Sequence, residues 1–286
     1  MRKSLLAALI LISCGKSTYH PPNADNLQVF RQKVEEIKPS LPVCLANDTL
    51  FACKDEMDGD VVLWNGLLAL SGDKTFCSAL PKSVDETGRP WRGPYFYKNY
   101  TVNEFSRDST VGLAAWAVGC NNKDTWQRFS TFYKQTNKLC EHPIDNKCDK
   151  SGNTNDLVAH IDRHFSIPNN ENIRGYSEIL LAQARFTERG YPMHLTGCQI
   201  LILNKIGTSN NTLDAAKKKL RERDPGNPFF NYLDKDENSA INLANQQVGL
   251  SGSKTQWSFE RHSSEKAWEN SMGYEWQVLL NLIQNN

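Results

Sequence analysis

The chain has 286 residues with 33 basic and 32 acidic side chains, so its formal charge is +1 at neutral pH. A chain of this length forms one large domain or two small ones. The near balance of charge excludes the strongly basic surface of a typical nucleic-acid-binding protein, and we expect no nucleic acid among its partners.

Residues 1–13 have the organisation of a secretory signal peptide. Arg2 and Lys3 form a short basic start, and an apolar run follows from Leu5 to Ile12. This run is much shorter than the ~20 apolar residues of a membrane-spanning helix. No later apolar run reaches that length either. We therefore expect any contact with a membrane to come from a lipid rather than from a spanning helix.

The end of this segment, Leu11-Ile12-Ser13-Cys14, resembles the processing box of bacterial lipoproteins. The resemblance implies that residues 1–13 are removed and that Cys14 is acylated. The glycine after the cysteine is compatible with sorting to the outer membrane. We therefore expect a lipid-anchored protein of the bacterial cell envelope, with residues 14–25 as a tether. The alternatives are an ordinary signal peptide with an incidental cysteine, or a buried strand.

Helical periodicity dominates residues 26–286, which we expect to form a single all-α domain with little sheet. The first helix contains Val29, Phe30, Val34 and Ile37, with Asp25 as its cap and Pro39 as its stop. Further helices are expected at 61–70, 111–118, 126–133, 155–165, 175–189, 193–206, 212–222, 237–249 and 264–284.

Seven cysteines follow Cys14, and in an exported protein such a number indicates disulfides. Two pairs are close enough in sequence to clip short loops: Cys44 with Cys53, and Cys140 with Cys148. The other three are Cys77, Cys120 and Cys198, so at least one thiol is expected to be free. Spacing alone does not determine the connectivity. No Cys-x-x-Cys pair occurs, and we expect neither a metal site nor a cofactor.

Two of the expected helices resemble each other at a distance of 48 residues. DVVLWNGLLAL begins at Asp60, and DSTVGLAAWAV begins at Asp108. Each follows a polar turn and precedes a turn that contains glycine. A period of this length is typical of the helical hairpins from which helical arrays are built.

Three aspartates, Asp58, Asp60 and Asp108, lie at the starts of these two helices. The simplest interpretation is that they cap the helices, because a carboxylate accepts hydrogen bonds from the free N–H groups of a first turn. If the two helices stand in parallel, however, the three side chains open at the same end of the domain. Two carboxylates in one cleft are the groups that hydrolyse glycosidic bonds.

The loop GRPWRGPYFY at residues 88–97 separates the two helices and carries four aromatic residues and two arginines. Aromatic faces stack on sugar rings, and a guanidinium group binds carboxylates and hydroxyls. Two interpretations remain open for this loop. It folds back on the core, or it lines a site in which Trp91, Arg92 and Tyr95, together with Arg107, hold a sugar.

The paired helices, the aspartates in DGDVVLWNGL and SRDSTVGL, and the aromatic loop resemble the (α/α) toroid glycoside hydrolases and polysaccharide lyases. NPFFNYL at 227–233 and the segment from Glu265 to Trp276 also resemble hairpin segments of that superfamily. The resemblance implies helical hairpins packed as a complete or partial toroid, here with disulfide-clipped loops. It places Asp58, Asp60 and Asp108 near the end of the ring where the connecting loops gather.

Two clusters with histidine are further candidates for chemistry. Asp156, His160 and His164 share one face of a helix, but they lack the HExxH pattern of zinc enzymes, and a solvated helix face is the default interpretation. Tyr191 and His194, with Arg189, follow Gly190 at a helix start. In lyases of the toroid class such residues neutralise a uronate and abstract a proton. The alternative is that they are ordinary polar residues at the start of a helix.

The sequence thus predicts a membrane-anchored, glycan-active hydrolase in which Asp60 and Asp108 form the acid–base pair and Asp58 assists. Its substrate would be a polysaccharide or a peptidoglycan-type glycan, and a polysaccharide lyase is the second enzymatic option. A non-catalytic carbohydrate-binding lipoprotein, or a structural envelope lipoprotein whose aspartates only cap helices, is the alternative.

Overall fold

The computed structural model describes residues 21–46, 49–53, 61–78, 83–98, 105–136, 139, 152–169, 175–248 and 273–285. Within these residues the chain is mostly helical, as predicted, with eleven α-helices and one two-stranded sheet. Asp58, Asp60, Cys14, Cys140 and Cys148 lie outside the described residues.

Most of the eleven helices lie where the sequence predicted a helix, although the short helix Pro228–Leu233 was not predicted and the helix expected at 264–284 is described only from Tyr274. They are α1 (Ala24–Ile37), α2 (Val61–Ser71), α3 (Arg107–Gly119), α4 (Lys123–Gln135), α5 (Gly152–His164), α6 (Tyr176–Phe186), α7 (Tyr191–Lys205), α8 (Asn211–Arg223), α9 (Pro228–Leu233), α10 (Glu237–Gln247) and α12 (Tyr274–Gln284). Strands β1 (Val43–Ala46) and β2 (Thr49–Ala52) form an antiparallel hairpin in which Cys44 lies opposite Phe51.

Two predicted helix starts are corrected by the structure. Asn23, and not Asp25, caps α1, because its Oδ1 accepts the backbone N–H of Asn26 at 3.1 Å. The helix therefore begins inside the segment that we expected to be a tether. In α3 the cap position belongs to Ser106, and Asp108 is the second residue of the helix rather than its cap.

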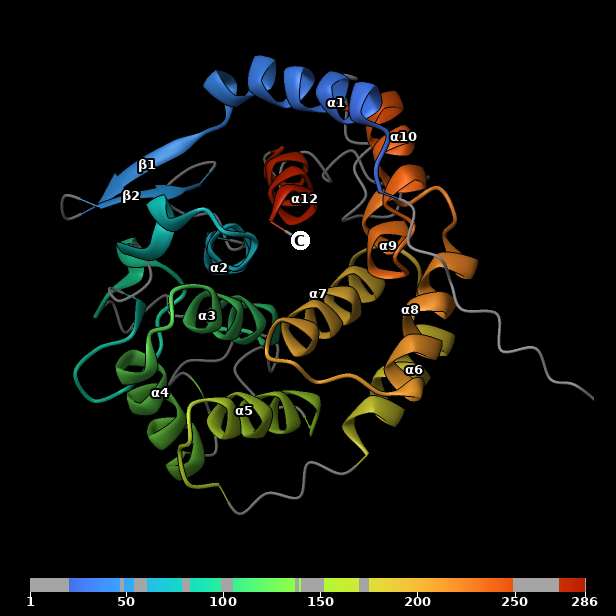
Figure 1. The fold of residues 1–286 in the computed structure, drawn as a ribbon. Coiled ribbons are helices and arrows are strands. Elements are labelled where there is room, and N and C mark those ends of the chain that lie inside the picture. Colours follow the sequence, from blue (N-terminus) through green and yellow to red (C-terminus); the bar gives the residue numbers. More distant parts are fainter. Residues whose placement is uncertain are drawn as a thin grey trace, which may run out of the picture.

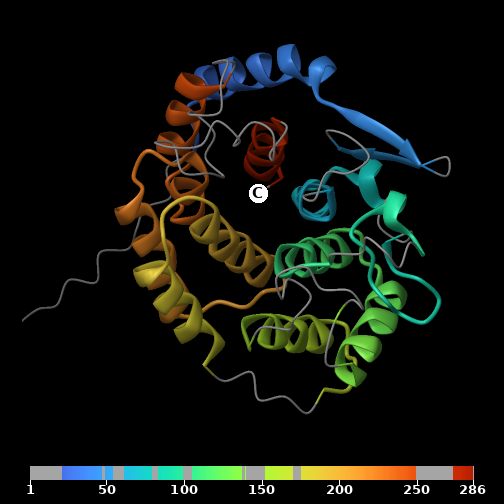
Figure 2. The same cartoon turned by 180° about the vertical axis from the view of Figure 1, so that it is seen from behind.

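The helices fall into two layers with different burial (Figure 1). Every residue of α2 is buried, and nine or more residues are buried in each of α3, α7 and α12. These four helices lie inside, whereas α1, α4, α5, α6, α8 and α10 surround them, as Figure 2 shows from behind. The outer helices bury one face only, as in α1, where the buried residues are Phe30 and Val34. A helix that is apolar all round belongs in a core, and an amphipathic helix covers it.

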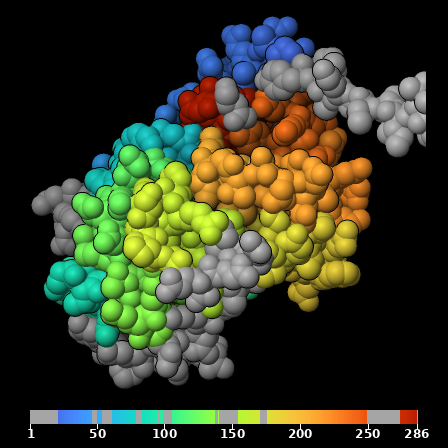
Figure 3. All heavy atoms as spheres, turned by 60° about the horizontal axis from the view of Figure 1, so that its bottom comes forward, coloured from blue at the N-terminus to red at the C-terminus, as the bar shows by residue number. Residues whose placement is uncertain are grey.

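The two ends of the described chain meet in the fold. Helix α1 packs against α10 and α12, and α12 packs against α2. Asparagine side chains join α1 to α10: the Nδ2 of Asn26 donates to Asn242 Oδ1 at 2.9 Å, and the Nδ2 of Asn245 donates to the carbonyl of Asn26 at 2.9 Å. In the space-filling view of Figure 3, α5 lies at the surface between α4 and the later helices.

The closest packing in the molecule joins α2 to α3, and it depends on glycine. A Cβ atom on Gly112 would lie 2.5 Å from the Cα of Leu63, and one on Gly119 would lie 2.5 Å from the backbone of Ala69 and Leu70. From the first contact to the second, the residue in α3 moves forward by seven positions, from Gly112 to Gly119. The residue in α2 also moves forward by seven, from Leu63 to Leu70, so the two helices run in the same direction. The two helices are therefore parallel, as a shared cleft requires. The residues of α2 and α3 that contact each other are separated along the chain by close to the 48-residue period.

Two disulfides stabilise the connections around these helices. Cys44–Cys53 closes the β-hairpin, as the sequence spacing indicated, and Cys77–Cys120 joins a 3₁₀ helix (Lys74–Ser78) to the end of α3. The remaining described cysteine, Cys198, is a buried free thiol, which confirms the expectation of at least one. Among the described residues, α2 is followed by this 3₁₀ helix and by a second one (Pro94–Phe96), whereas α3 is followed by the full helix α4.

The contact between α2 and α3 yields a stability prediction. Gly112→Ala should lower the free energy of unfolding by ~2–4 kcal/mol, because the new methyl group overlaps backbone atoms that cannot move without separating two buried helices. Gly175→Ala is the matched control. Gly175 has a φ of +100°, but nothing lies within 4 Å of the position that a Cβ atom would take. Gly175→Ala should therefore lower the free energy of unfolding by only ~1 kcal/mol, from backbone strain. Urea unfolding of both variants measures the difference, and equal costs would contradict the packing argument.

Candidate functional site

The first turns of α2, α3 and α7 meet and form the candidate site. Parallel packing brings the starts of α2 and α3 to the same end of the molecule. Helix α7 joins them, because the ring of His194 stacks on the indole of Trp64 with centroids 5.6 Å apart. Of the predicted catalytic residues, Asp108 is described and lies here. Asp58 and Asp60, which directly precedes α2 in sequence, lie outside the described residues.

Asp108 makes its hydrogen bonds to hydroxyl groups and not to the N–H groups of its own helix. Its Oδ1 accepts from the hydroxyl of Ser106, and its Oδ2 accepts from the hydroxyl of Tyr191 at 2.8 Å. Tyr191 is the first residue of α7 and lies 83 positions away in the chain. The Asp108 residue is half-buried, and the two hydroxyl groups orient its carboxylate.

Asp108 and Tyr191 belong to separate clusters in the sequence, and only the structure brings them together. The residue types themselves signalled both positions, since each lies at a helix start. No spacing rule in the sequence connects them, because the contact depends on how α7 packs against α3. Arg107, predicted to bind substrate, is the first residue of α3 and is exposed beside Asp108.

His194 lies one turn into α7 and is completely buried. Burial lowers its pKa to about 3, because the charged imidazolium form would lose its hydration. The Nε2 of His194 lies 3.4 Å from the Sγ of Cys198, and burial raises the pKa of that thiol. The imidazole is therefore neutral at physiological pH, and the thiol is protonated. Neither group is accessible to solvent as a base or a nucleophile, so their role at the site is structural.

The aromatic loop is divided between the core and the surface. Trp91 is fully buried, and its Nε1 donates to Asp85 Oδ2 at 3.2 Å, so its ring packs in the core and presents no face to a sugar. The prediction of Trp91 as a sugar-stacking residue is therefore wrong, and the core alternative holds for it. The guanidinium of Arg92 lies 5.7 Å from the ring centroid of Phe96, a cation–π arrangement. The side chain of Tyr95 is outside the described part.

The two histidines of α5 contact aromatic side chains. The ring of His160 lies 5.3 Å from that of Tyr176, and His164 packs edge-on against Phe165. Among the described residues, no group of three His, Cys, Asp or Glu side chains is arranged to hold a metal ion. The default interpretation of these histidines as part of a helix face agrees with this geometry.

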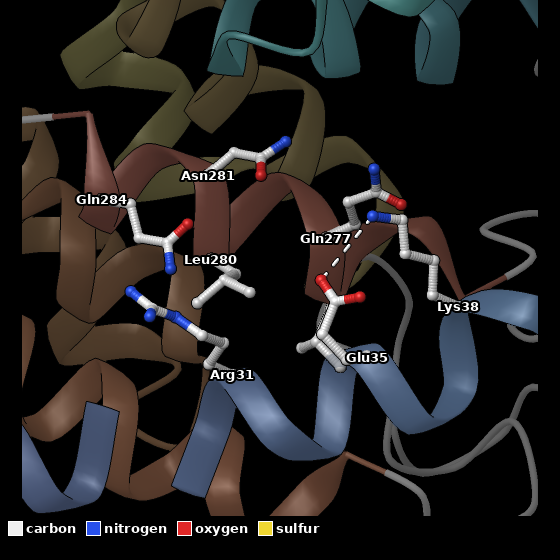
Figure 4. Close-up of a pocket in the computed structure, with 8 residues that line it drawn as sticks. Arg31, Glu35, Lys38, Gln277, Leu280, Asn281 and Gln284 are labelled. Atoms are coloured by element: carbon white, nitrogen blue, oxygen red, sulfur yellow. Dashed lines mark ion pairs between the residues drawn. The ribbon is translucent and has the colours of Figure 1, made fainter. Parts of the chain in front are cut away.

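A small polar groove of about 230 Å³ lies elsewhere, between α1 and α12 (Figure 4). With the Gln284 amide turned so that its oxygen faces α1, that oxygen accepts from Nε of Arg31 at 2.8 Å. Lys38 pairs with Glu35 at 3.6 Å on the same side. The charged groups of this groove are thus partnered within the protein, which indicates a helix contact rather than a ligand site.

The buried histidine yields a prediction about pH. In the unfolded chain His194 titrates near pH 6.5, whereas in the folded chain it remains neutral down to about pH 3. Below pH 6.5 the unfolded state therefore binds a proton that the folded state does not, and stability falls as the pH falls. Protonation of His194 in the unfolded chain should lower the free energy of unfolding by about 2 kcal/mol between pH 7 and pH 5.

The matched variant is His194→Gln, which should lose this component of the pH dependence whatever its stability at pH 7. Urea unfolding of both proteins at pH 7 and pH 5 measures it. The same pH dependence in the two proteins would show that His194 is not held neutral by the fold.

Comparison with known proteins identifies no relative. No protein family, no curated protein and no solved structure matches the chain. Among the described residues, no helix has the length and apolar character needed to cross a membrane. The geometry of the site therefore carries the functional argument.

Proposed function

We propose that the chain is a lipid-anchored enzyme of the cell envelope that hydrolyses a glycan, with Asp108 in its active site. The observation that carries this proposal is the pair of hydroxyl groups, from Ser106 and Tyr191, that hold the Asp108 carboxylate. An aspartate that only capped its helix would bond to backbone N–H groups of the first turn. A half-buried carboxylate oriented from two elements suits chemistry on a bound ligand.

The arrangement of the helices supports a partial (α/α) toroid. Inner helices buried all round and outer amphipathic helices form two layers, and the first and last described helices pack together. In such a toroid the starts of the inner helices gather around the active site. Because Asp60 directly precedes α2 in the sequence, parallel packing of α2 and α3 would favour an approach of Asp60 to Asp108.

In the proposed reaction two carboxylates share the work of breaking a glycosidic bond. One carboxylic acid, Asp60 or Asp108, protonates the leaving oxygen, and the other carboxylate attacks the sugar or activates water. Asp58 assists, and Tyr191 orients Asp108. Arg107, exposed next to Asp108, and Arg92 are the candidates for binding the glycan. Tyr95 remains a candidate from sequence alone.

The catalytic proposal is tested by substitution at Asp108. Asp108→Asn and Asp60→Asn should each lower turnover of peptidoglycan or exported polysaccharides by ~10²–10⁴-fold, the usual contribution of an acid–base group. Tyr191→Phe should lower it by ~10-fold, because the carboxylate loses an orienting hydrogen bond worth about 1 kcal/mol or more.

Asp124→Asn is the matched control for Asp108→Asn, because Asp124 is also the second residue of its helix, α4, and is exposed. It should keep the wild-type turnover. Wild-type turnover in Asp108→Asn would remove Asp108 from the active site. A wild-type protein that binds glycan without cleaving it would support the carbohydrate-binding alternative.

The hydrogen bond from Tyr191 favours one second candidate, a polysaccharide lyase. In a lyase a base removes the proton beside the uronate carboxyl group, and a tyrosine can carry that proton to the leaving oxygen. The two reactions differ in their products, because elimination leaves a carbon–carbon double bond that absorbs ultraviolet light. Hydrolysis leaves a new reducing end without such absorption.

The proposed anchor rests on Cys14 and is tested separately. Cells that express the wild-type protein should incorporate a palmitate analogue into it, and Cys14→Ser should abolish the label, because no acceptor thiol remains at the processing site. Cys198→Ser is a suitable control, because Cys198 is buried and should not affect labelling. Label that persists in Cys14→Ser would exclude the lipoprotein assignment.

A further inference from the structure

A second cavity, of about 380 Å³, lies among α7, α8, α9 and the start of α10, away from Asp108. Its floor is apolar, formed by Leu201, Leu233 and the ring of Tyr232, all of them buried. Its rim is polar, and this cavity has the size and the mixed lining of a small-molecule site. Its polar lining residues are Asn204, Lys205, Ser209, Asp214, Lys217, Lys235 and Glu237.

Lys217 is the unusual residue of this cavity, because it is a lysine with only 4% of its surface exposed. Its ammonium group has three N–H donors, and in the described structure its hydrogen-bond partner is Asp214, at 2.9 Å. The Asp214 side chain is itself 56% exposed, so it compensates only part of the cost of burying the ammonium group. Two donors of Lys217 remain for another acceptor in the cavity that it lines.

Four other side chains that line the cavity also carry hydrogen-bond donors without a partner in the described part of the protein. Within the described residues, the side chains of Lys205, Lys235, Asn204 and Ser209 make no hydrogen bond or ion pair with the protein. Loss of hydration lowers the pKa of Lys205, and no carboxylate opposes this effect. Of the two carboxylates that line the cavity, that of Asp214 pairs with Lys217.

We infer that this cavity binds a small molecule through an oxyanion, a phosphate or a carboxylate group, held by Lys217, Lys205 and Lys235. The buried Lys217 supplies charge-assisted hydrogen bonds, and the two exposed lysines, Lys205 and Lys235, contact the anion from the rim. Asn204 and Ser209 supply neutral donors. The apolar floor accommodates the uncharged body of the molecule.

Titration calorimetry on the full-length protein tests this inference with inorganic phosphate and, in a separate experiment, with acetate. The two probes distinguish the sources of the oxyanion, and saturable binding of either supports the site. Lys205→Gln and Lys235→Gln should each raise the Kd by ~10-fold, as expected for the loss of one charge-assisted hydrogen bond. The double variant should raise it further.

Lys218→Gln is the matched control, since Lys218 is the exposed neighbour of Lys217 on α8 and does not line the cavity. It should keep the wild-type Kd. Asp108→Asn should also keep it, which separates this site from the proposed glycan site. No saturable binding of either probe, or an unchanged Kd in the double variant, would overturn the inference.

A second measurement does not depend on calorimetry. An amine-acylating reagent should modify Lys205 and Lys235 more slowly when the bound probe is present, while Lys218 reacts at the same rate with and without it. Peptide mass spectrometry reports each lysine separately. Equal rates at Lys205 and Lys235 with and without saturating probe would also overturn the proposal.

Discussion

The close parallel contact between α2 and α3 is the constraint on which the rest of the structure depends. Glycines at positions 66, 112 and 119 remove the side chains that would hold the two backbones apart. The helices can then approach until backbone atoms touch, with little freedom to slide along each other. Because they are parallel, their starts lie at the same end of the molecule. The position of Asp108 relative to the start of α2 follows from that contact.

The core tolerates several polar groups because hydrogen bonds satisfy them. Asn65 of α2 accepts the N–H of Ala52 at 2.9 Å and donates to the carbonyl of the same residue at 2.9 Å, which attaches the β-hairpin to the inner layer. Asp162 of α5 is fully buried and accepts from Trp126 Nε1 at 2.9 Å and Ser130 Oγ at 2.8 Å. Buried polar groups of this kind fix the relative positions of elements that apolar packing alone leaves adjustable.

The partners of the charged side chains distinguish the groove between α1 and α12 from the cavity around Lys217. In the groove between α1 and α12, Arg31 faces an amide oxygen and Lys38 faces Glu35. In the cavity around Lys217, Asp214 pairs with that lysine, whereas the side chains of Lys205, Lys235 and Asn204 make no hydrogen bond or ion pair within the described residues. A protein gains nothing in stability from an ammonium group buried with one partial partner. Ligand binding gives such a group a physical reason to be there.

The sequence by itself determined the helical class and most helix positions, because those depend on local periodicity and on glycine and proline stops. It also indicated the Cys44–Cys53 pair, since its members are nine positions apart in the sequence. It did not determine that Trp91 is buried, that Tyr191 bonds to Asp108, or that Cys77 pairs with Cys120. Those contacts join segments that are distant along the chain or depend on the path of a loop, and the packing of the inner helices decides them. The tertiary structure alone also assembled the lysine cavity, because its lining comes from four helices whose facing sides no periodicity identifies.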